Sequence, residues 1–194
     1  TASGKPVKGV MDTWLHQTGF PVVDVSVKGK KVTLEQKRFQ YSNTADKTLW
    51  PVPLTFVTAN GSLESRLFEK KEEKFTLSAP PRWLKANSGQ KGFYRVRYDK
   101  KSLKKLEEAV RKKELPEADR WGLHNDQFTL CLAGEISLQQ YLEFTRAYEK
   151  EDSSLVLIDL ISSLGWFALL AHDEPFLAKI KERQRELYEK AFTD

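Results

Sequence analysis

Residues 21–34 read PVVDVSVKGKKVTL, and this stretch decides how the first half of the chain folds. Three valines alternate with polar residues over 23–27, and the same period of two returns at Val32 and Leu34 after a turn of lysines and one glycine. Alternation of this kind is typical of a strand with one buried face, and two such runs around a glycine turn are typical of a hairpin. We therefore predict a β-hairpin here.

Short segments rich in β-forming residues continue after the hairpin, and Asn-Gly, Pro-Pro and Asn-Ser-Gly breakers separate them. The further strands are predicted at 51–58, 63–69, 74–77, 83–85 and 93–98. No helical pattern intervenes between them. Regular short strands of this kind predict an antiparallel, immunoglobulin-like β-sandwich over residues 20–99.

Helical periodicity frames the strands on both sides. Before them, apolar residues recur at helical spacing after Pro6, which predicts a helix within residues 1–19 that Gly19 ends. After them, apolar stripes begin at Leu103 and continue toward the C-terminus, with the β-to-α boundary near 99–102 and one of the helices starting near Ser137. We predict an all-α part over residues 100–194, whose short connections favour antiparallel helical hairpins, the start of a solenoid.

Composition narrows the class of protein. Of 194 residues 40% are hydrophobic, which is enough for folded cores, and 32 basic against 27 acidic residues leave a net charge of only +5. We therefore expect no nucleic-acid partner and no membrane partner. The single cysteine, Cys131, cannot form an internal disulfide, which favours a reducing, cytoplasmic location. Because the sequence opens at Thr1 without a methionine, we interpret it as a processed or shortened chain.

Side chains that could carry out catalysis are scarce. None of His16, His124 and His172 has a second histidine within helical reach, so a His-Glu-x-x-His metal site cannot be built. We interpret His124 as a partly buried core histidine. Leucines flank Cys131, and no Gly-x-Ser-x-Gly turn is present. We predict no catalytic, cofactor-binding or metal-binding residue in this chain.

One short motif suggests a different class of function. Residues 91–98 read KGFYRVRY and partly match the strand signature of RNA-recognition domains. Tyr94 stands where that signature has a small residue, and Arg95 stands where it has a base-stacking ring. We favour an edge or outer strand with both arginines on one face, and RNA binding is kept as an alternative.

Five motifs, in order along the chain, resemble the zinc-dependent aminopeptidases of the aminopeptidase N, puromycin-sensitive and tricorn-interacting-factor type. They cover about the first three quarters of the sequence. The motifs are VMDTWLHQTGFPVV at 10–23, QKRF at 36–39, WPVPL at 50–54, WLKAN with GFYRV at 83–96, and DRWGL at 119–123 followed by Asp126, Phe128, Leu130, Ala133 and Gly134.

The resemblance implies a full-length parent enzyme that uses zinc to remove N-terminal residues from peptides. This chain has neither the His-Glu-x-x-His helix nor the Gly-x-Met-Glu-Asn strand of that family, so no family site residue can be assigned to it. It would be the non-catalytic part after the catalytic domain, a scaffold that restricts access for peptides. Its implied partners are its own catalytic domain and the parent's peptide substrates. A stand-alone protein-interaction module of the same fold is the alternative.

The stretch from Leu155 to Ala171 is apolar at nearly every position, so a helix there must be covered on most sides. In the family, further helices would supply part of that cover. We expect apolar surface to stay open in this chain and to support self-association through the C-terminal helices.

Overall fold

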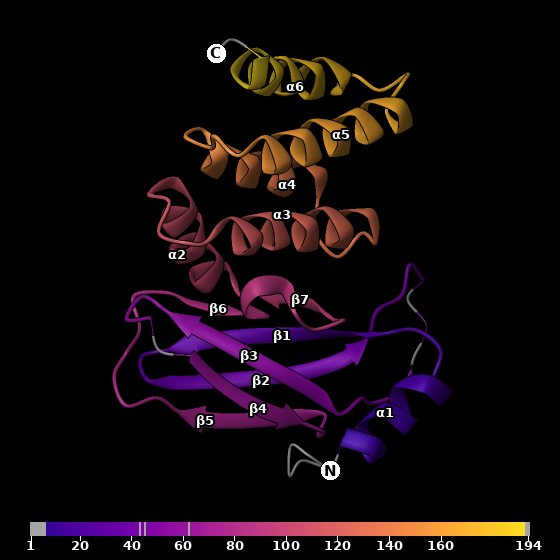
Figure 1. Ribbon diagram of the computed structural model, residues 1–194. Coiled ribbons are helices and arrows are strands. Elements are labelled where there is room, and N and C mark those ends of the chain that lie inside the picture. The colour runs from indigo at the N-terminus through magenta and orange to yellow at the C-terminus, as the bar shows by residue number, and fades with distance from the viewer. Residues whose placement is uncertain (1–6, 43, 45, 62, 193–194) are drawn as a thin grey trace. The chain divides into compact units, whose positions relative to one another are not determined.

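The computed structural model describes residues 7–42, 44, 46–61 and 63–192. Within the chain, two compact units can be separated, residues 1–104 and 105–194. The strands belong to the first unit, and most of the helical residues belong to the second (Figure 1). The predicted order, sheets first and helices afterwards, is confirmed.

Two small sheets make up the first unit, and a helix, α1 (Val7–His16), precedes them. The four-stranded sheet has the order β5-β2-β1-β7, with β1 Pro21–Lys28, β2 Lys31–Arg38, β5 Glu72–Thr76 and β7 Arg95–Tyr98. The three-stranded sheet has the order β4-β3-β6, with β3 Val52–Thr58, β4 Leu63–Phe68 and β6 Leu84–Ala86. A short 3-10 turn, η1 (Ser88–Gln90), lies between β6 and β7.

The predicted hairpin is confirmed as β1 and β2. Val25 lies opposite Leu34 and Val27 opposite Val32, and Gly29 takes a positive φ of 61° in the turn. Glycine adopts this left-handed conformation without the strain that a side chain would bring. The alternation of residue types therefore sets the register as the sequence indicates.

One strand pair differs from the all-antiparallel prediction. β7 is an edge strand, as predicted, but it runs parallel to β1, with Val23 opposite Val96 and Asp24 opposite Arg97. The Arg97 guanidinium binds both carboxylate oxygens of Asp24, at 2.5 and 2.7 Å. β7 reaches β1 from the other sheet rather than through a hairpin, and a strand that arrives by such a crossover can pair in parallel.

A buried amide ties the two sheets of this unit together. The Gln36 side chain on β2 accepts a hydrogen bond from the Trp50 backbone N–H at 2.9 Å. It donates to the backbone oxygens of Trp50 and Lys70, both at 3.0 Å. Trp14 on α1 reaches the same place, where its indole N–H donates to the Pro51 oxygen at 3.0 Å. The motif residues Gln36 and Trp50 therefore hold the core together, and Trp14 fixes α1 next to the start of β3.

The last strand begins at Arg95, two residues later than predicted, because Asn87 holds the preceding segment in a turn. The Asn87 side chain accepts from the Gly92 N–H at 2.8 Å and donates to the Gly92 oxygen at 3.0 Å. Backbone groups that are engaged by a side chain in this way are not available to a strand ladder. Tyr94 just before the strand and Val96 and Tyr98 within it are buried on alternate positions, which leaves both arginines on the other face.

We expect Gly92→Ala to lower the free energy of unfolding by about 1–3 kcal/mol, because a methyl group there would overpack the core. A Cβ at Gly92 would collide with the Tyr94 ring, coming within 2.7 Å of its Cδ1 atom, and Tyr94 is buried. Urea denaturation measures the change. Gly9→Ala on α1 is the matched control, since a Cβ there would meet no atom within 4 Å apart from its chain neighbours and its own helix backbone. Equal stability of the two variants would contradict this packing argument.

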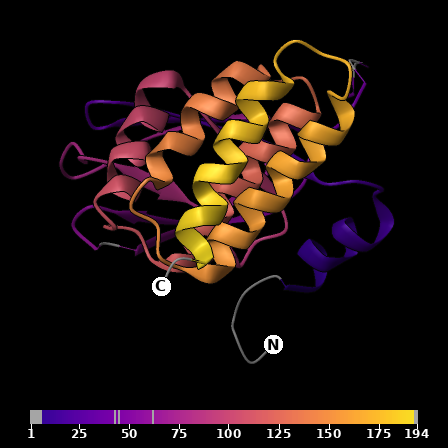
Figure 2. The same cartoon turned by 90° about the horizontal axis from the view of Figure 1, so that it is seen from above.

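The second unit is helical. Its elements are α2 Lys100–Arg111, which begins in the first unit, α3 Glu117–Leu132, α4 Leu138–Thr145, the 3-10 turn η2 Arg146–Tyr148, α5 Ser154–Leu170 and α6 Leu177–Phe192. The predicted helix start at Ser137 is confirmed, since its hydroxyl and the Gln140 side chain form a reciprocal capping box. α5 contacts α3 on one side and α6 on another, and Figure 2 shows α5 and α6 side by side.

Candidate functional site

The three histidines lie in separate parts of the fold, on α1, on α3 and in the turn after α5, and they do not form a cluster. His16, at the end of α1, is exposed and its ring contacts the Asp12 oxygen, and His172 is exposed beside Asp173. Among the residues that the structure describes, no three His, Cys, Asp or Glu side chains lie close enough together to hold a metal ion. The described side chains therefore do not fit a zinc site, since such a site takes three or four of these ligands.

His124 is a core residue, as predicted, and it is fully buried. Its Nδ1 atom lies 2.8 Å from an Asp159 carboxylate oxygen on α5, and its Nε2 atom lies 2.8 Å from the Tyr141 hydroxyl on α4. Burial raises the pKa of Tyr141 far above its ordinary value, so this hydroxyl keeps its proton. The histidine therefore joins three helices through a buried polar network, and it takes a structural role.

Arg120 and Glu151 form a second buried centre in this unit. The guanidinium donates to both carboxylate oxygens at 2.7 Å and to the Leu115 oxygen at 2.8 Å, and the two side chains are 9% and 1% exposed. Burial alone would raise the pKa of Glu151, but hydrogen bonds from Arg120 and from the Ser153 N–H outweigh it and lower that pKa. Tyr148 adds a hydrogen bond from its hydroxyl to the Arg120 oxygen at 2.8 Å.

This pair gives the Asp119-Arg120 motif its physical role, and sequence reasoning missed Glu151. The two residues are 31 positions apart, and a glutamate between Lys150 and Asp152 reads as a solvated charge. The one available signal was the arginine itself. A motif arginine at the start of an apolar helix face needs an acidic partner if it is buried.

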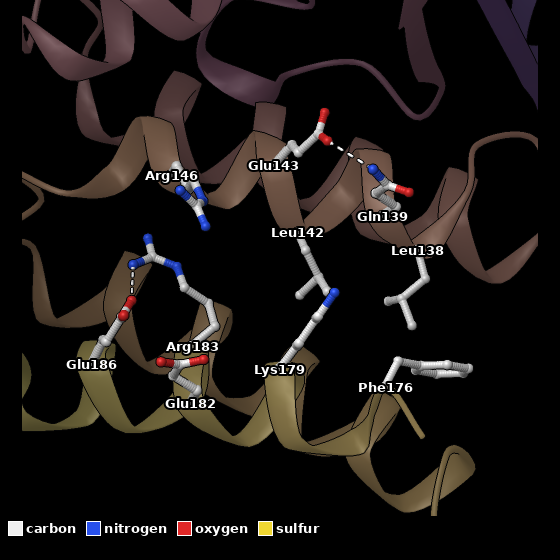
Figure 3. A pocket seen from close by; sticks show the side chains of 10 residues that line it. All are labelled: Leu138, Gln139, Leu142, Glu143, Arg146, Phe176, Lys179, Glu182, Arg183 and Glu186. Atoms are coloured by element: carbon white, nitrogen blue, oxygen red, sulfur yellow. Dashed lines mark hydrogen bonds and ion pairs between the residues drawn. The ribbon is translucent and has the colours of Figure 1, made fainter. Parts of the chain in front are cut away.

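A groove of about 600 Å³ lies between α4 and α6 (Figure 3). Its lining is apolar at one end, where Leu138, Leu142 and Phe176 lie, and charged at the other. Arg183 is held there by the Thr145 oxygen at 2.8 Å and by Glu186 at 2.7 Å. Side chains of both charge signs line it: Glu143, Arg146, Lys179, Glu182, Arg183 and Glu186. The groove therefore offers apolar contact at one end and charged groups of both signs at the other.

In the described part of the chain, none of the helices combines the length and the apolar character that crossing a bilayer requires.

Comparison with known proteins identifies the family. Residues 83–194 match a family model described as the ERAP1-like C-terminal domain. Probable aminopeptidase 2 of Sulfurisphaera tokodaii is 35% identical over 89% of this chain and 21% of that protein. Aminopeptidase M1-A of Oryza sativa subsp. japonica is 36% identical over 93% of this chain and 22% of that protein. Tricorn protease-interacting factor F2 of Thermoplasma volcanium is 33% identical over 84% of this chain and 20% of that protein.

The chain thus spans about a fifth of the length of the curated relatives that it matches. These relatives bear out the resemblance of the five motifs, and the family model covers more than half of the chain. The chain therefore belongs to the aminopeptidase family that carries the ERAP1-like C-terminal domain.

Proposed function

We propose that this chain is a non-catalytic scaffold part of a zinc metallo-aminopeptidase that removes N-terminal residues from peptides. One observation carries the proposal: the chain aligns along most of its length with aminopeptidases but spans only a fifth of them. The structural roles of the motif residues support it. Gln36, Trp50 and Arg120 all lie in buried hydrogen-bond networks. Zinc and the residues that bind it would belong to another part of the parent enzyme.

The finer architecture is part of the same proposal. We assign residues 1–19 to the end of the catalytic domain, 20–99 to an immunoglobulin-like spacer sandwich, and 100–194 to the first helices of a C-terminal solenoid. The two short sheets with apolar residues on alternate positions support the sandwich. The successive contacts of α3 with α4 and of α5 with α6 support the solenoid.

The location and partners of the parent enzyme are also proposed. A cytoplasmic protein fits the single Cys131, whose pKa burial raises to about 11, so that its thiol stays protonated and unreactive. The partners would be the parent's own catalytic domain and its peptide substrates. In this role the helices limit which peptides can reach the active site.

A stand-alone interaction module is the second candidate, and the groove between α4 and α6 favours it. RNA binding has less support. In an RNA-recognition strand the rings that stack on bases are accessible, whereas here Arg95 replaces one of these rings and Tyr98, at another ring position, is only 6% exposed.

The isolated chain is expected to hydrolyse no aminoacyl substrate and to retain no stoichiometric zinc after dialysis. The physical reason is that its described side chains offer no cluster of metal ligands. Zinc content is measured by atomic absorption, and activity is measured with fluorogenic aminoacyl amides. One zinc per chain together with activity that a chelator abolishes would overturn the proposal.

A chimera separates the scaffold role from the stand-alone role. In it, this chain replaces the matching segment of Aminopeptidase M1-A from Oryza sativa subsp. japonica, which is 36% identical. A scaffold is expected to restore a folded enzyme that releases N-terminal residues, whereas the same enzyme with the segment deleted is expected to be inactive. A chimera no more active than the deletion would favour the stand-alone module.

A further inference from the structure

The outward face of α5 is apolar although it is exposed. Five large side chains on this helix are between 50% and 68% exposed: Leu155, Ile158, Trp166, Leu169 and Leu170. The single charged residue in the helix is Asp159, and its carboxylate is engaged by His124. The neighbouring helix α6 differs, since lysine, arginine and glutamate residues are frequent in it. The exposed face of α5 therefore has the composition of a contact surface.

The size of this face is suitable for association. Five large apolar side chains that are at least half exposed expose several hundred Å², while the largest patch on a typical monomer is roughly 300–600 Å². Each partner of a standard protein interface buries about 800 Å². The face could thus supply most of the area of a stable interface.

The spacing along the face is symmetric, and this feature indicates the partner. We define the α5 stripe as Leu155, Ile158, Ser162, Trp166 and Leu169, all of them exposed. The steps between these residues are three, four, four and three, so the stripe reads the same in both directions from Ser162. Steps of three and four are those by which packed helices meet.

A second copy of α5, placed antiparallel, would match this stripe residue for residue. A twofold axis at Ser162 brings Leu155 opposite Leu169 of the other copy and Ile158 opposite Trp166, and Ser162 meets its own counterpart. In an isologous interface each such contact occurs twice. The serine at the centre is small and lets the two helix backbones approach, while the larger side chains lie on either side of it.

We propose that this chain forms a homodimer through the α5 stripe, with the two α5 helices antiparallel and the twofold axis at Ser162. A strongly charged partner would find no opposite charge on the stripe, whereas an identical apolar stripe complements it. This proposal concerns the chain of 194 residues and is tested separately from the proposed enzymatic role, because it rests on the exposed face and the spacing of α5.

Disulfide trapping tests the pairing, in a Cys131→Ser background so that the introduced thiol is the only cysteine. Ser162→Cys is expected to form a disulfide-linked dimer under mild oxidation, because residues at the axis can approach within the roughly 4.4–6.8 Å between Cα atoms that a disulfide needs. Ser154→Cys is the matched control on the same helix and is also exposed. The antiparallel geometry places its two copies about 24 Å apart, at 1.5 Å per residue, so it should not cross-link.

Sedimentation equilibrium gives a second readout, in which the unmodified chain is compared with two aspartate variants. Ser162→Asp is expected to raise the dimer dissociation constant about tenfold or more, since like charges would meet at the axis, while Ser154→Asp should leave it nearly unchanged. Equal cross-linking of the two cysteine variants would indicate parallel or non-specific pairing and would overturn the proposal. A monomer at high concentration, or a dimer that tolerates Ser162→Asp, would overturn it as well. In the monomeric case another polypeptide segment would be the partner of this face.

Discussion

Replacing Glu151 by alanine is expected to lower the free energy of unfolding by about 3–5 kcal/mol, because it would leave a buried guanidinium without its counter-charge. Arg120 donates two hydrogen bonds to this carboxylate, and its side chain is 9% exposed. The backbone N–H groups of Asp152 and Ser153 would lose the same acceptor. Urea denaturation followed by circular dichroism measures the loss.

Asp152→Ala is the control for this prediction, since it removes the neighbouring carboxylate and breaks a surface ion pair with Lys113. Asp152 is exposed, so we expect little change in stability.

The pH dependence of the Glu151→Ala penalty adds a second check. The pKa of Glu151 is lowered in the folded state, so its contribution is complete above the ordinary glutamate value of about 4.3 and is lost as pH falls through the folded value. A penalty for Glu151→Ala that stays constant through this pH range would contradict the ion-pair argument.

Trp50→Ala is expected to lower the free energy of unfolding by about 3–5 kcal/mol, because it removes a large side chain from the core between the strands and leaves a cavity. Trp50 is fully buried, and its ring centroid lies 6.2 Å from that of Trp14. Its backbone is held on both sides by Gln36, so the site cannot easily collapse around the smaller residue. Thermal and urea unfolding measure the loss.

Trp50→Phe is the matched control for the tryptophan. In the described part of the structure the indole Nε1–H of Trp50 has no hydrogen-bond acceptor. The phenylalanine variant therefore loses side-chain volume but no hydrogen bond. We therefore expect Trp50→Phe to lower the free energy of unfolding clearly less than Trp50→Ala does. If phenylalanine proved as damaging as alanine, an acceptor for the indole N–H, such as a buried water molecule, would have to be present.

The features that could be predicted from sequence are those set by neighbouring residues. The β1–β2 hairpin followed from alternation and one glycine, and the start of α4 followed from Ser137 and the apolar residues after it. The parallel pairing of β7 with β1 could not be predicted in this way. Its partners are more than 70 positions apart, and their direction depends on how the chain crosses between sheets.

The buried polar centres show the same division between local and distant signals. His124 could be assigned to the core because it lies on an apolar helix face, and the structure buries it. Glu151 could not be distinguished by sequence from its neighbour Glu149, although Glu151 is buried and Glu149 lies on the surface. Burial of a charge is decided by its partner, and the partner Arg120 is on another helix.

The parallel pairing of β1 with β7 affects the order in which the first unit can fold. β1 is made early, but its outer edge stays open until residues 95–98 have been synthesised. During that interval the backbone N–H and C=O groups along β1 can pair with any other extended segment, including one from a neighbouring nascent chain. Contacts so distant in sequence also slow folding. Completion of this sheet therefore waits for the last strand, and until then the outer edge of β1 is open to pairing with another chain.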